Sequence, residues 1–206
     1  MIKLVIFDMD GVLVDARELH YQALNEALPD DLKISREDHL LKYDGLSTKT
    51  KLEMLGVEAC VRGQVWSEKQ KVTKSMMREL LSPDKVKGDA FMALGGLYVA
   101  VCSNSIRSTV NSALMQIGVF NHVDITFGND DVVYGKPSTE MYLRAMLHCC
   151  VDPCETLIIE DSKVGRQGAV RSGAHVLGVR NPNEVTKERI MREIDEINGL
   201  LVNLMS

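Results

Sequence analysis

Residues 2–11 read Ile-Lys-Leu-Val-Ile-Phe-Asp-Met-Asp-Gly, an apolar run that ends in two aspartates and a glycine. The run is short, largely β-branched and closed by charge, which predicts a buried central strand of a parallel sheet. Asp8 and Asp10 then lie at the carboxyl end of that strand, where α/β folds bind their ligands. Two carboxylates this close raise each other's pKa, so a cation or proton chemistry is expected beside them.

Four further apolar runs resemble this one, at residues 96–102, 123–127, 156–159 and 175–179. Helical patterns lie between and after them, because apolar residues recur at spacings of three and four in residues 110–117 and 190–197. Strands that alternate with helices indicate an α/β fold with a Rossmann-like parallel sheet and right-handed crossovers.

The alternation is interrupted once, directly after the first strand. Residues 15–87 contain no convincing strand pattern, and Leu19, Ala23 and Ala27 recur at helical spacing before a break at Pro29. The sequence therefore predicts a Rossmann-like catalytic core of residues 1–14 and 88–206, with a helical cap domain of residues 15–87 inserted into it. Trp66 is the only tryptophan, and we expect it to anchor the small core of the cap.

Composition narrows the classes of partner. The chain has 206 residues, 45% of them hydrophobic, and a formal net charge of −5. An acidic chain is poorly suited to nucleic acid or to an anionic membrane surface, and no apolar run approaches the roughly 20 residues that span a bilayer. Five cysteines without regular spacing suggest reduced thiols. We expect a cytoplasmic monomer or weak oligomer whose partner is a small molecule.

Polar side chains follow the predicted strands at the points where they end. They are Asp8 and Asp10 after the first strand, Ser103 and Asn104 after the second, and Glu160 and Asp161 after the fourth. Lys136 precedes Pro137 at the mouth of a helix expected near Ser138. In a doubly wound sheet all these positions converge on one crevice.

These residue types suit phosphoryl transfer. Asp8 can attack phosphorus and form an aspartyl-phosphate, while Asp10 can protonate the leaving oxygen and later deprotonate water. A Mg²⁺ ion held by Asp8, Asp161 and a backbone carbonyl would offset the repulsion between carboxylate and phosphate. Lys136 and Ser103, with Asn104 beside it, are expected to bind the transferring group.

In order and spacing, these residues resemble the four motifs of the haloacid dehalogenase-like phosphohydrolases. The motifs are Asp8-Met-Asp-Gly-Val-Leu-Val-Asp15, Val-Cys-Ser103-Asn, Lys136-Pro137 and Ile-Ile-Glu160-Asp161-Ser. The resemblance extends from Ile2 to about Val179. Gly165, Ala169 and Gly173, together with the position of the helical cap, resemble the branch of β-phosphoglucomutases and sugar phosphatases.

The resemblance implies a role for each motif residue. Asp8 would be the nucleophile and a magnesium ligand, and Asp10 the general acid/base, with its carbonyl a second ligand. Ser103 and Lys136 would bind the phosphoryl group. Asp161 would be a ligand, and Glu160 a direct or water-mediated one.

In the cap, Asp15 and His20 resemble residues that contact the acid/base or the substrate, and Gly45 opens a segment comparable to a phosphate-binding segment of the mutases. Dehalogenases of the family lack an aspartate at the position of Asp10, because halide needs no proton. Asp10 therefore favours a phosphatase that acts on a phosphate monoester, such as a sugar phosphate or a similar metabolite.

Three alternatives stay open. The cap of a sugar-phosphate mutase carries an arginine after a Gly-Val-Ser segment, but here Thr48 follows Gly45-Leu46-Ser47, and Lys49 would substitute only by a register shift. A phosphonate-cleaving member would form a Schiff base on a cap lysine, and the candidates by type are Lys33, Lys42, Lys49 and Lys51. A non-catalytic binding or regulatory protein on this fold would lack a motif residue, and none is missing.

Overall fold

Five parallel strands form one sheet in the order β3-β2-β1-β4-β5. The computed structural model describes the backbone of residues 1–205 and the side chains of residues 1–200. The strands are β1 (Leu4–Phe7), β2 (Tyr98–Cys102), β3 (Ile125–Phe127), β4 (Thr156–Glu160) and β5 (His175–Gly178). Each of the five apolar runs coincides with one strand, which confirms the predicted parallel α/β sheet, and β4 extends one residue further than its run to include Glu160.

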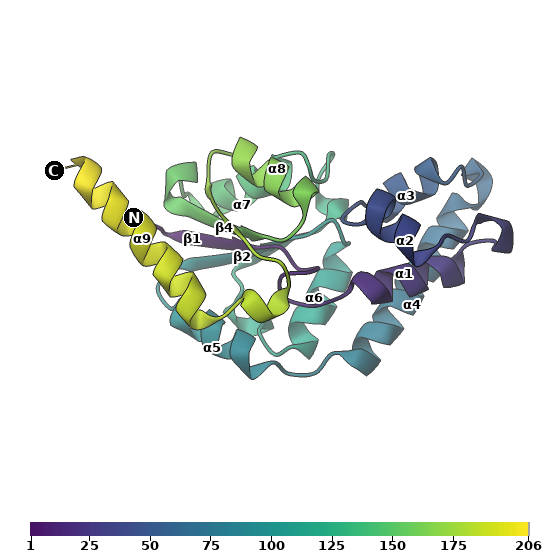
Figure 1. Ribbon diagram of the computed structural model, residues 1–206, viewed down its shortest axis with the longest axis horizontal. Helices are drawn as coiled ribbons and strands as arrows, with labels where there is room; N and C mark the ends of the chain where they lie inside the picture. The colour runs from purple at the N-terminus through teal and green to yellow at the C-terminus, as the bar shows by residue number, and fades with distance from the viewer. Residues whose placement is uncertain (206) are drawn as a thin grey trace.

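The sheet has a core on each face, because successive side chains of a strand point to opposite sides. Val5 and Phe7 belong to the core under α5 (Lys85–Ala93), α6 (Arg107–Gln116) and α9 (Lys187–Met205). Leu4 and Ile6 belong to the core under α7 (Glu140–Cys149) and α8 (Lys163–Arg171). Figure 1 shows the resulting three layers, with the sheet between the two groups of helices. Both faces of β1 are covered, which explains its continuous apolar run.

Between β1 and β2 the chain leaves the sheet and forms a group of helices at one end of it (Figure 1). These are α1 (Arg17–Ala27), α2 (Arg36–Asp38), a π-helical turn (His39–Tyr43), α3 (Thr48–Met54) and α4 (Ala59–Leu80). A separate small core joins α1, α3 and α4, formed by Leu24, Leu28, Leu52, Val57 and Val65. The predicted helical insertion after the first strand is confirmed, while its limits at residues 15 and 87 stay a prediction.

Short 3-10 turns complete the secondary structure, at Asp30–Leu32, Phe120–His122, Asn129–Asp131, Pro153–Glu155 and Pro182–Glu184. Trp66 is not part of the small core of the insertion. It lies on α4 with 38% of its surface exposed, whereas its neighbour Val65 is buried. The prediction that Trp66 anchors this core is wrong, because Val65 occupies the inward-facing position of the helix.

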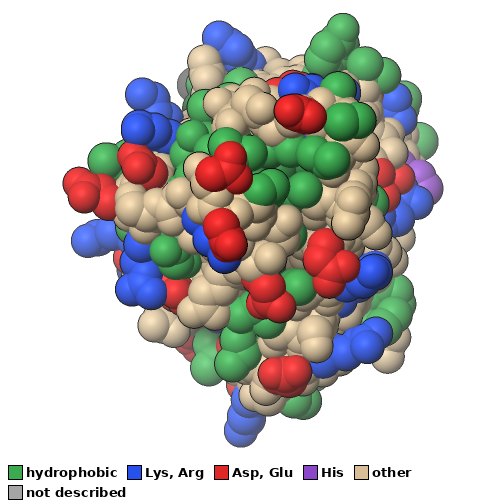
Figure 2. Space-filling model, turned by 90° about the vertical axis from the view of Figure 1, so that its right-hand side faces the viewer, with side chains coloured by type: hydrophobic (Ala, Val, Ile, Leu, Met, Phe, Trp, Pro, Cys, Tyr) green, Lys and Arg blue, Asp and Glu red, His purple; other side chains and the backbone are tan. Residues whose placement is uncertain are grey.

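The end of the molecule formed by the insertion carries acidic and basic side chains interspersed, rather than one basic face (Figure 2). All five cysteines are free. Within the part of the chain that the structure describes, no helix combines the length and the apolar character needed to cross a bilayer.

Candidate active site

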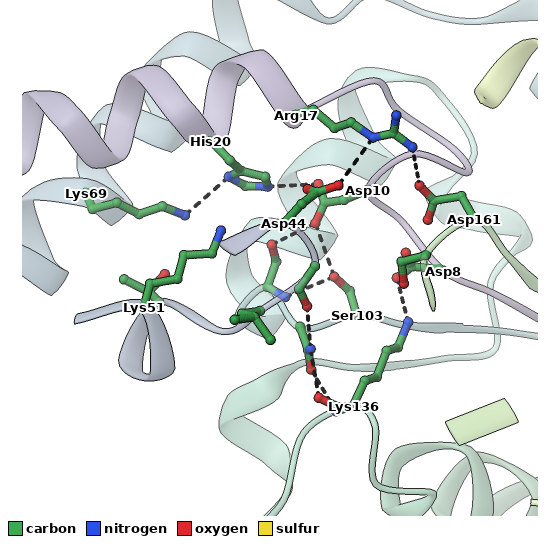
Figure 3. Close-up of a pocket in the computed structure, with 16 residues that line it drawn as sticks. Asp8, Asp10, Arg17, His20, Asp44, Lys51, Lys69, Ser103, Lys136 and Asp161 are labelled. Atoms are coloured by element: carbon green, nitrogen blue, oxygen red, sulfur yellow. Dashed lines mark hydrogen bonds and ion pairs between the residues drawn. The ribbon is translucent and has the colours of Figure 1, made fainter. Parts of the chain in front are cut away.

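The carboxyl ends of β1, β2 and β4 meet at one edge of the sheet, and a pocket lies between this edge and the insertion (Figure 3). From the core it is lined by Asp8, Asp10, Ser103, Asn104, Ser105, Lys136, Asp161 and Ser162. From the insertion and the segment leading into it, it is lined by Arg17, His20, Asp44, Gly45, Leu46, Thr48, Lys51 and Lys69. The structure thus gathers most of the predicted site residues in one place.

A tight turn after β1 holds the two aspartates at the pocket. The Met9 carbonyl accepts a hydrogen bond from the backbone N–H of Leu13 at 2.8 Å, and the Gly11 N–H donates to the Val14 carbonyl at 2.7 Å. Gly11 has a φ of +85°, and a Cβ there would lie 2.1 Å from Oδ2 of Asp161. Only glycine combines that conformation with that close approach.

Lys136 joins two carboxylates at the floor of the pocket. Its Nζ donates to Oδ1 of Asp8 at 2.7 Å and to Oε1 of Glu160, which also accepts from the Tyr142 hydroxyl at 2.7 Å. Burial lowers the pKa of Lys136, but the charges of Asp8 and Glu160 outweigh burial and raise it well above its usual value. Lys136 is therefore a fixed cation beside Asp8.

Asp8, Glu160 and Asp161 form an acidic cluster whose carboxylate oxygens lie within 4.8 Å of one another. Burial and the charge of Glu160 raise the pKa of Asp8 well above its usual value, against the effect of Lys136. Oδ1 of Asp161 is buried and accepts no hydrogen bond from any described residue, while its Oδ2 accepts from Arg17 at 2.6 Å. A divalent cation would satisfy that oxygen and offset the negative charge, so this hard-oxygen donor set fits Mg²⁺.

Asp10 has very different surroundings. His20 Nε2 lies 2.9 Å from its Oδ1, the Ser105 hydroxyl donates to its Oδ2 at 2.9 Å, and the Ser103 hydroxyl does so at 3.4 Å. Burial raises the pKa of Asp10, but His20, Ser105 and the charge of Lys69 outweigh burial and lower it to about 2. The pKa values of Asp8 and Asp10 are thus displaced in opposite directions, a split that favours different roles for the two carboxylates.

Lys69 orients His20. The Lys69 Nζ lies 3.2 Å from Nδ1 of His20. Because the ionised Asp10 carboxylate only accepts, Nε2 of His20 carries the proton that it donates to Asp10, and Nδ1 of the neutral ring accepts from Lys69. Burial lowers the pKa of His20, which favours the neutral imidazole. The structure therefore places His20 on α1 as the donor that positions the Asp10 carboxylate.

Asn104 and Gly45 connect the core to the insertion. The Asn104 side chain donates to the Gly45 carbonyl at 2.8 Å and accepts from the backbone N–H of Lys136 at 2.9 Å. Its amide is therefore engaged with the protein backbone. Asp15 is exposed and does not line the pocket, because Val14 and Ala16 on either side are buried and turn the side chain between them outward.

Four pocket residues escaped the sequence analysis: Arg17, Asp44, Ser105 and Lys69. Ser105 follows Ser103 and Asn104 at the same strand end, and that nearness was a usable signal. Arg17, Asp44 and Lys69 lie in the polar insertion, where no local pattern separates them from solvated charges. Only the packing of the insertion over the sheet edge brings them to the site, Arg17 from α1, Lys69 from α4 and Asp44 from the end of the π-helical turn.

Among the cap lysines proposed by type, Lys51 alone lines the pocket, whereas Lys33, Lys42 and Lys49 are exposed. Lys51 is 5% exposed, and burial lowers its pKa to about 8. Thr48, which stands where a mutase would carry arginine, also lines the pocket.

Comparison with known proteins matches residues 5–179 to the family of haloacid dehalogenase-like hydrolases. The protein YhcW of Bacillus subtilis is 28% identical over 203 residues, covering 95% of this chain and 90% of YhcW. The phosphorylated carbohydrates phosphatase of Thermotoga maritima is 27% identical over 177 residues, covering 82% and 81% of the two chains.

Among solved structures, a CbbY variant from Rhodobacter sphaeroides in complex with xylulose-(1,5)bisphosphate has the same fold. It superposes with a TM-score of 0.80 at 21% identity, over 91% of this chain and 89% of its own. The family match covers all four motifs whose side chains meet at the sheet edge. The chain therefore belongs to the haloacid dehalogenase-like hydrolases.

Proposed function

We propose that this hydrolase is a Mg²⁺-dependent phosphatase that acts on a small phosphate monoester through an aspartyl-phosphate on Asp8. The observation that carries the proposal is the contrast between two neighbouring aspartates. Asp8 contacts Lys136 within an acidic cluster suited to a metal ion, and Asp10 contacts His20 and Ser105. A relative named for phosphorylated carbohydrates supports a sugar phosphate or a similar metabolite as substrate.

In the first step the Asp8 carboxylate attacks phosphorus, and the bond from phosphorus to the leaving oxygen breaks. Lys136 and the Ser103 hydroxyl stabilise the charge on the phosphoryl oxygens. Asp8, Asp161 and the Asp10 carbonyl would hold the Mg²⁺ ion, with Glu160 beside them. When bound, the ion would offset the negative charge of the carboxylate and the phosphoryl group.

Asp10 first donates a proton to the leaving group and then accepts one from water. A bound phosphoryl group brings negative charge close to Asp10 and raises its pKa, so that Asp10 carries a proton for the leaving oxygen. In the second step Asp10 accepts a proton from water, and the water attacks the aspartyl-phosphate and releases inorganic phosphate. His20 and Ser105 hold the carboxylate in place through both steps.

Hydrolysis of p-nitrophenyl phosphate tests the proposal. We expect turnover that requires Mg²⁺ and is lost in Asp8→Asn, because an amide is not a nucleophile for phosphorus. Mass spectrometry of the wild-type protein after a rapid acid quench should show a gain of one phosphoryl group that Asp8→Asn lacks. Persistent turnover in that variant would refute the assignment of Asp8, and no turnover of any phosphate ester would refute the enzyme itself.

The mutase alternative is tested on the same protein. Thr48 lines the pocket where a mutase would carry arginine, and Lys49 points to solvent, so this chain lacks a planar cation for a second phosphate at that position. We expect inorganic phosphate from a hexose 1-phosphate, even when a hexose bisphosphate is added as primer. Conversion to the hexose 6-phosphate without release of phosphate would establish a mutase.

The burial of Lys51 gives the phosphonate alternative a specific observation, because a desolvated lysine can form a Schiff base with a carbonyl. Cleavage of a phosphonate in this way does not need an acid/base at Asp10. For this reason we retain a phosphate ester as the proposed substrate. Treatment with phosphonoacetaldehyde and borohydride separates the two. We expect no covalent adduct on Lys51, and a reduced adduct there would favour the phosphonate.

A further inference from the structure

Lys51 differs from the other basic side chains of the pocket in having no partner. Arg17 donates to Asp161, Lys136 to Asp8, and Lys69 lies against His20, which contacts Asp10. Among the described residues, no hydrogen bond or ion pair reaches the Lys51 ammonium. Lys51 lies on α3, and Figure 3 shows its side chain extending along the insertion side of the pocket toward Lys69.

The Lys51 side chain is only 5% exposed. An unpaired charge at such a position destabilises the folded protein, because the loss of hydration is compensated only when a buried charge has a partner. The negative charges of Asp44 and Asp10 favour the cationic form of Lys51, but neither makes contact. Asp44 lies 3.7 Å from Arg17, and Asp10 is held by His20. The acids on the pocket wall are therefore already engaged.

The position of Lys51 indicates which part of a bound ligand would pair with its ammonium group. Lys136 and the acidic cluster lie on the sheet side of the pocket, where the phosphoryl group is transferred. Lys51 on α3 and Lys69 on α4 lie on the opposite side, in the insertion, and the charge of Lys51 lowers the pKa of Lys69. A ligand that spans the pocket places its phosphoryl group near Lys136 and the rest of the molecule near Lys51.

We propose that Lys51 binds a second anionic group in the leaving part of the substrate, so that the substrate is a phosphate ester that also carries a carboxylate or a second phosphate. This inference rests on the phosphatase proposed above. It assigns Lys51 a role in specificity, with the transferring phosphoryl group left to Lys136 and Ser103. An ion pair formed in a buried pocket discriminates more strongly than an exposed one, because water competes less for both partners.

Two matched pairs of substrates test the proposal on the full chain with Mg²⁺. The carboxylate arm compares 2-phosphoglycolate with 2-hydroxyethyl phosphate, which differ only in the carboxylate. The phosphate arm compares glucose 1,6-bisphosphate with glucose 6-phosphate. The wild-type protein should favour the doubly anionic member of at least one pair, by about 10-fold or more in kcat/KM, and the arm that shows it identifies the anion.

Lys51→Met removes the charge and keeps an unbranched side chain that is one atom shorter, and Lys49→Met on the exposed face of the same helix is the matched control. We expect Lys51→Met to lower kcat/KM for the doubly anionic substrate about 10- to 100-fold more than for its partner. Lys49→Met should leave the ratio unchanged. Because Lys51 is buried without a partner, Lys51→Met should also unfold at a higher temperature than the wild type.

The outcomes separate this inference from the proposed function. If no phosphate ester is turned over, the phosphatase itself is refuted. If both members of each pair react equally well, or if Lys51→Met lowers kcat/KM for both members by the same factor, the second anion site is refuted while the phosphatase stands. A lower unfolding temperature for Lys51→Met together with an unchanged substrate ratio would make Lys51 a structural residue and overturn the assignment.

Discussion

Two identical side chains, Asp8 and Asp10, differ chemically only through what surrounds them. Burial and the neighbouring charge of Glu160 raise the pKa of Asp8, so a cation beside it would favour the ionised carboxylate that the proposed nucleophile requires. Burial raises the pKa of Asp10, but His20, the hydrogen bond from Ser105 and the charge of Lys69 outweigh burial and lower it. One residue separates them, yet Asp8 contacts Lys136 while Asp10 contacts His20 and Ser105.

Substitution of Asp161 tests the proposed metal site through thermal stability, a measurement that does not require turnover. If Asp8 and Asp161 hold Mg²⁺, the ion binds the folded protein and stabilises it. At about 100 times the dissociation constant, Mg²⁺ should raise the Tm of the wild type by about 5–10 °C. In Asp161→Asn this rise should largely disappear, because a carboxylate ligand is lost.

Asp89→Asn is the matched control for the metal site, since Asp89 is exposed on α5 and far along the chain from the cluster. It removes one negative charge and should keep the full effect of Mg²⁺. The measurement is a thermal melt of each variant with Mg²⁺ and with a chelator. An equal rise in Asp161→Asn and the wild type would contradict a metal site at the acidic cluster.

At the same scale, the sequence predicted the residues of the motifs but not their partners. Asp161 was predictable because it follows a recognisable strand, and parallel strands end at a common edge. Lys136 was predictable because it precedes Pro137 at the start of a predicted helix. Arg17 was not, because it lies among other charges of a polar segment and its contact with Asp161 spans 144 positions of sequence. Asp15 was predicted at the site but faces solvent, because the extended chain alternates sides and its neighbours are buried.

At the scale of elements, the turn between β1 and α1 determines the geometry of the site. Gly11→Ala should abolish activity and destabilise the fold by about 2 kcal/mol or more. Its Cβ would overlap the Asp161 carboxylate, and its φ of +85° is unfavourable for alanine. Chemical denaturation of both proteins measures the loss.

Gly63→Ala is the control for Gly11. Gly63 lies within α4 with nothing within 4 Å of an added Cβ, so alanine there should stabilise the protein by about 0.5–1 kcal/mol. Equal effects of the two substitutions would show that the turn tolerates a side chain and that its geometry is not required.

The elements themselves were largely predictable, since their patterns are local. The apolar runs marked each strand, and the spacing of Ile190, Ile194 and Ile197 marked α9, all three of which are buried. The insertion was harder to predict in detail. Its small core is made by side chains from three helices, so the role of Trp66 depended on how α4 is rotated, which a polar segment does not reveal.

At the scale of the whole molecule, the pocket exists only because two separately built cores face each other. The sheet supplies acids and Lys136, and the insertion supplies Lys51, Lys69 and His20. The Asn104 side chain links the two through the Gly45 carbonyl. The sequence could place the acids, whose strands are adjacent in one sheet, but not the two lysines, whose burial follows from how the insertion covers the sheet edge.

This arrangement predicts a particular dependence of stability on pH. In the unfolded chain the pKa of a lysine is near 10.5, whereas burial lowers the pKa of Lys51 to about 8 and that of Lys69 to about 7. Between the folded and the unfolded pKa of each lysine, the unfolded state binds more protons than the folded state. Each buried lysine therefore lowers the free energy of unfolding by its full amount below its folded pKa, and this loss disappears as the pH rises toward 10.5. For Lys51 the penalty corresponds to at most about 3 kcal/mol.

Lys51→Met should therefore raise the free energy of unfolding by up to about 3 kcal/mol at pH 7, and this gain should shrink by about 1 kcal/mol by pH 9. Comparing variant with wild type at each pH cancels the titration of Asp8, Lys136 and the buried Cys102. The pKa of Lys69 does change, because the charge of Lys51 lowers it, and its rise in Lys51→Met adds to the gain. Lys49→Met, which alters an exposed lysine of the same helix, should show no such trend. A loss of stability in Lys51→Met at pH 7 would mean that the lysine is compensated in the folded protein. A gain, combined with the loss of preference for a second anion, would show that the fold gives up stability at α3 to keep a cation ready for its substrate.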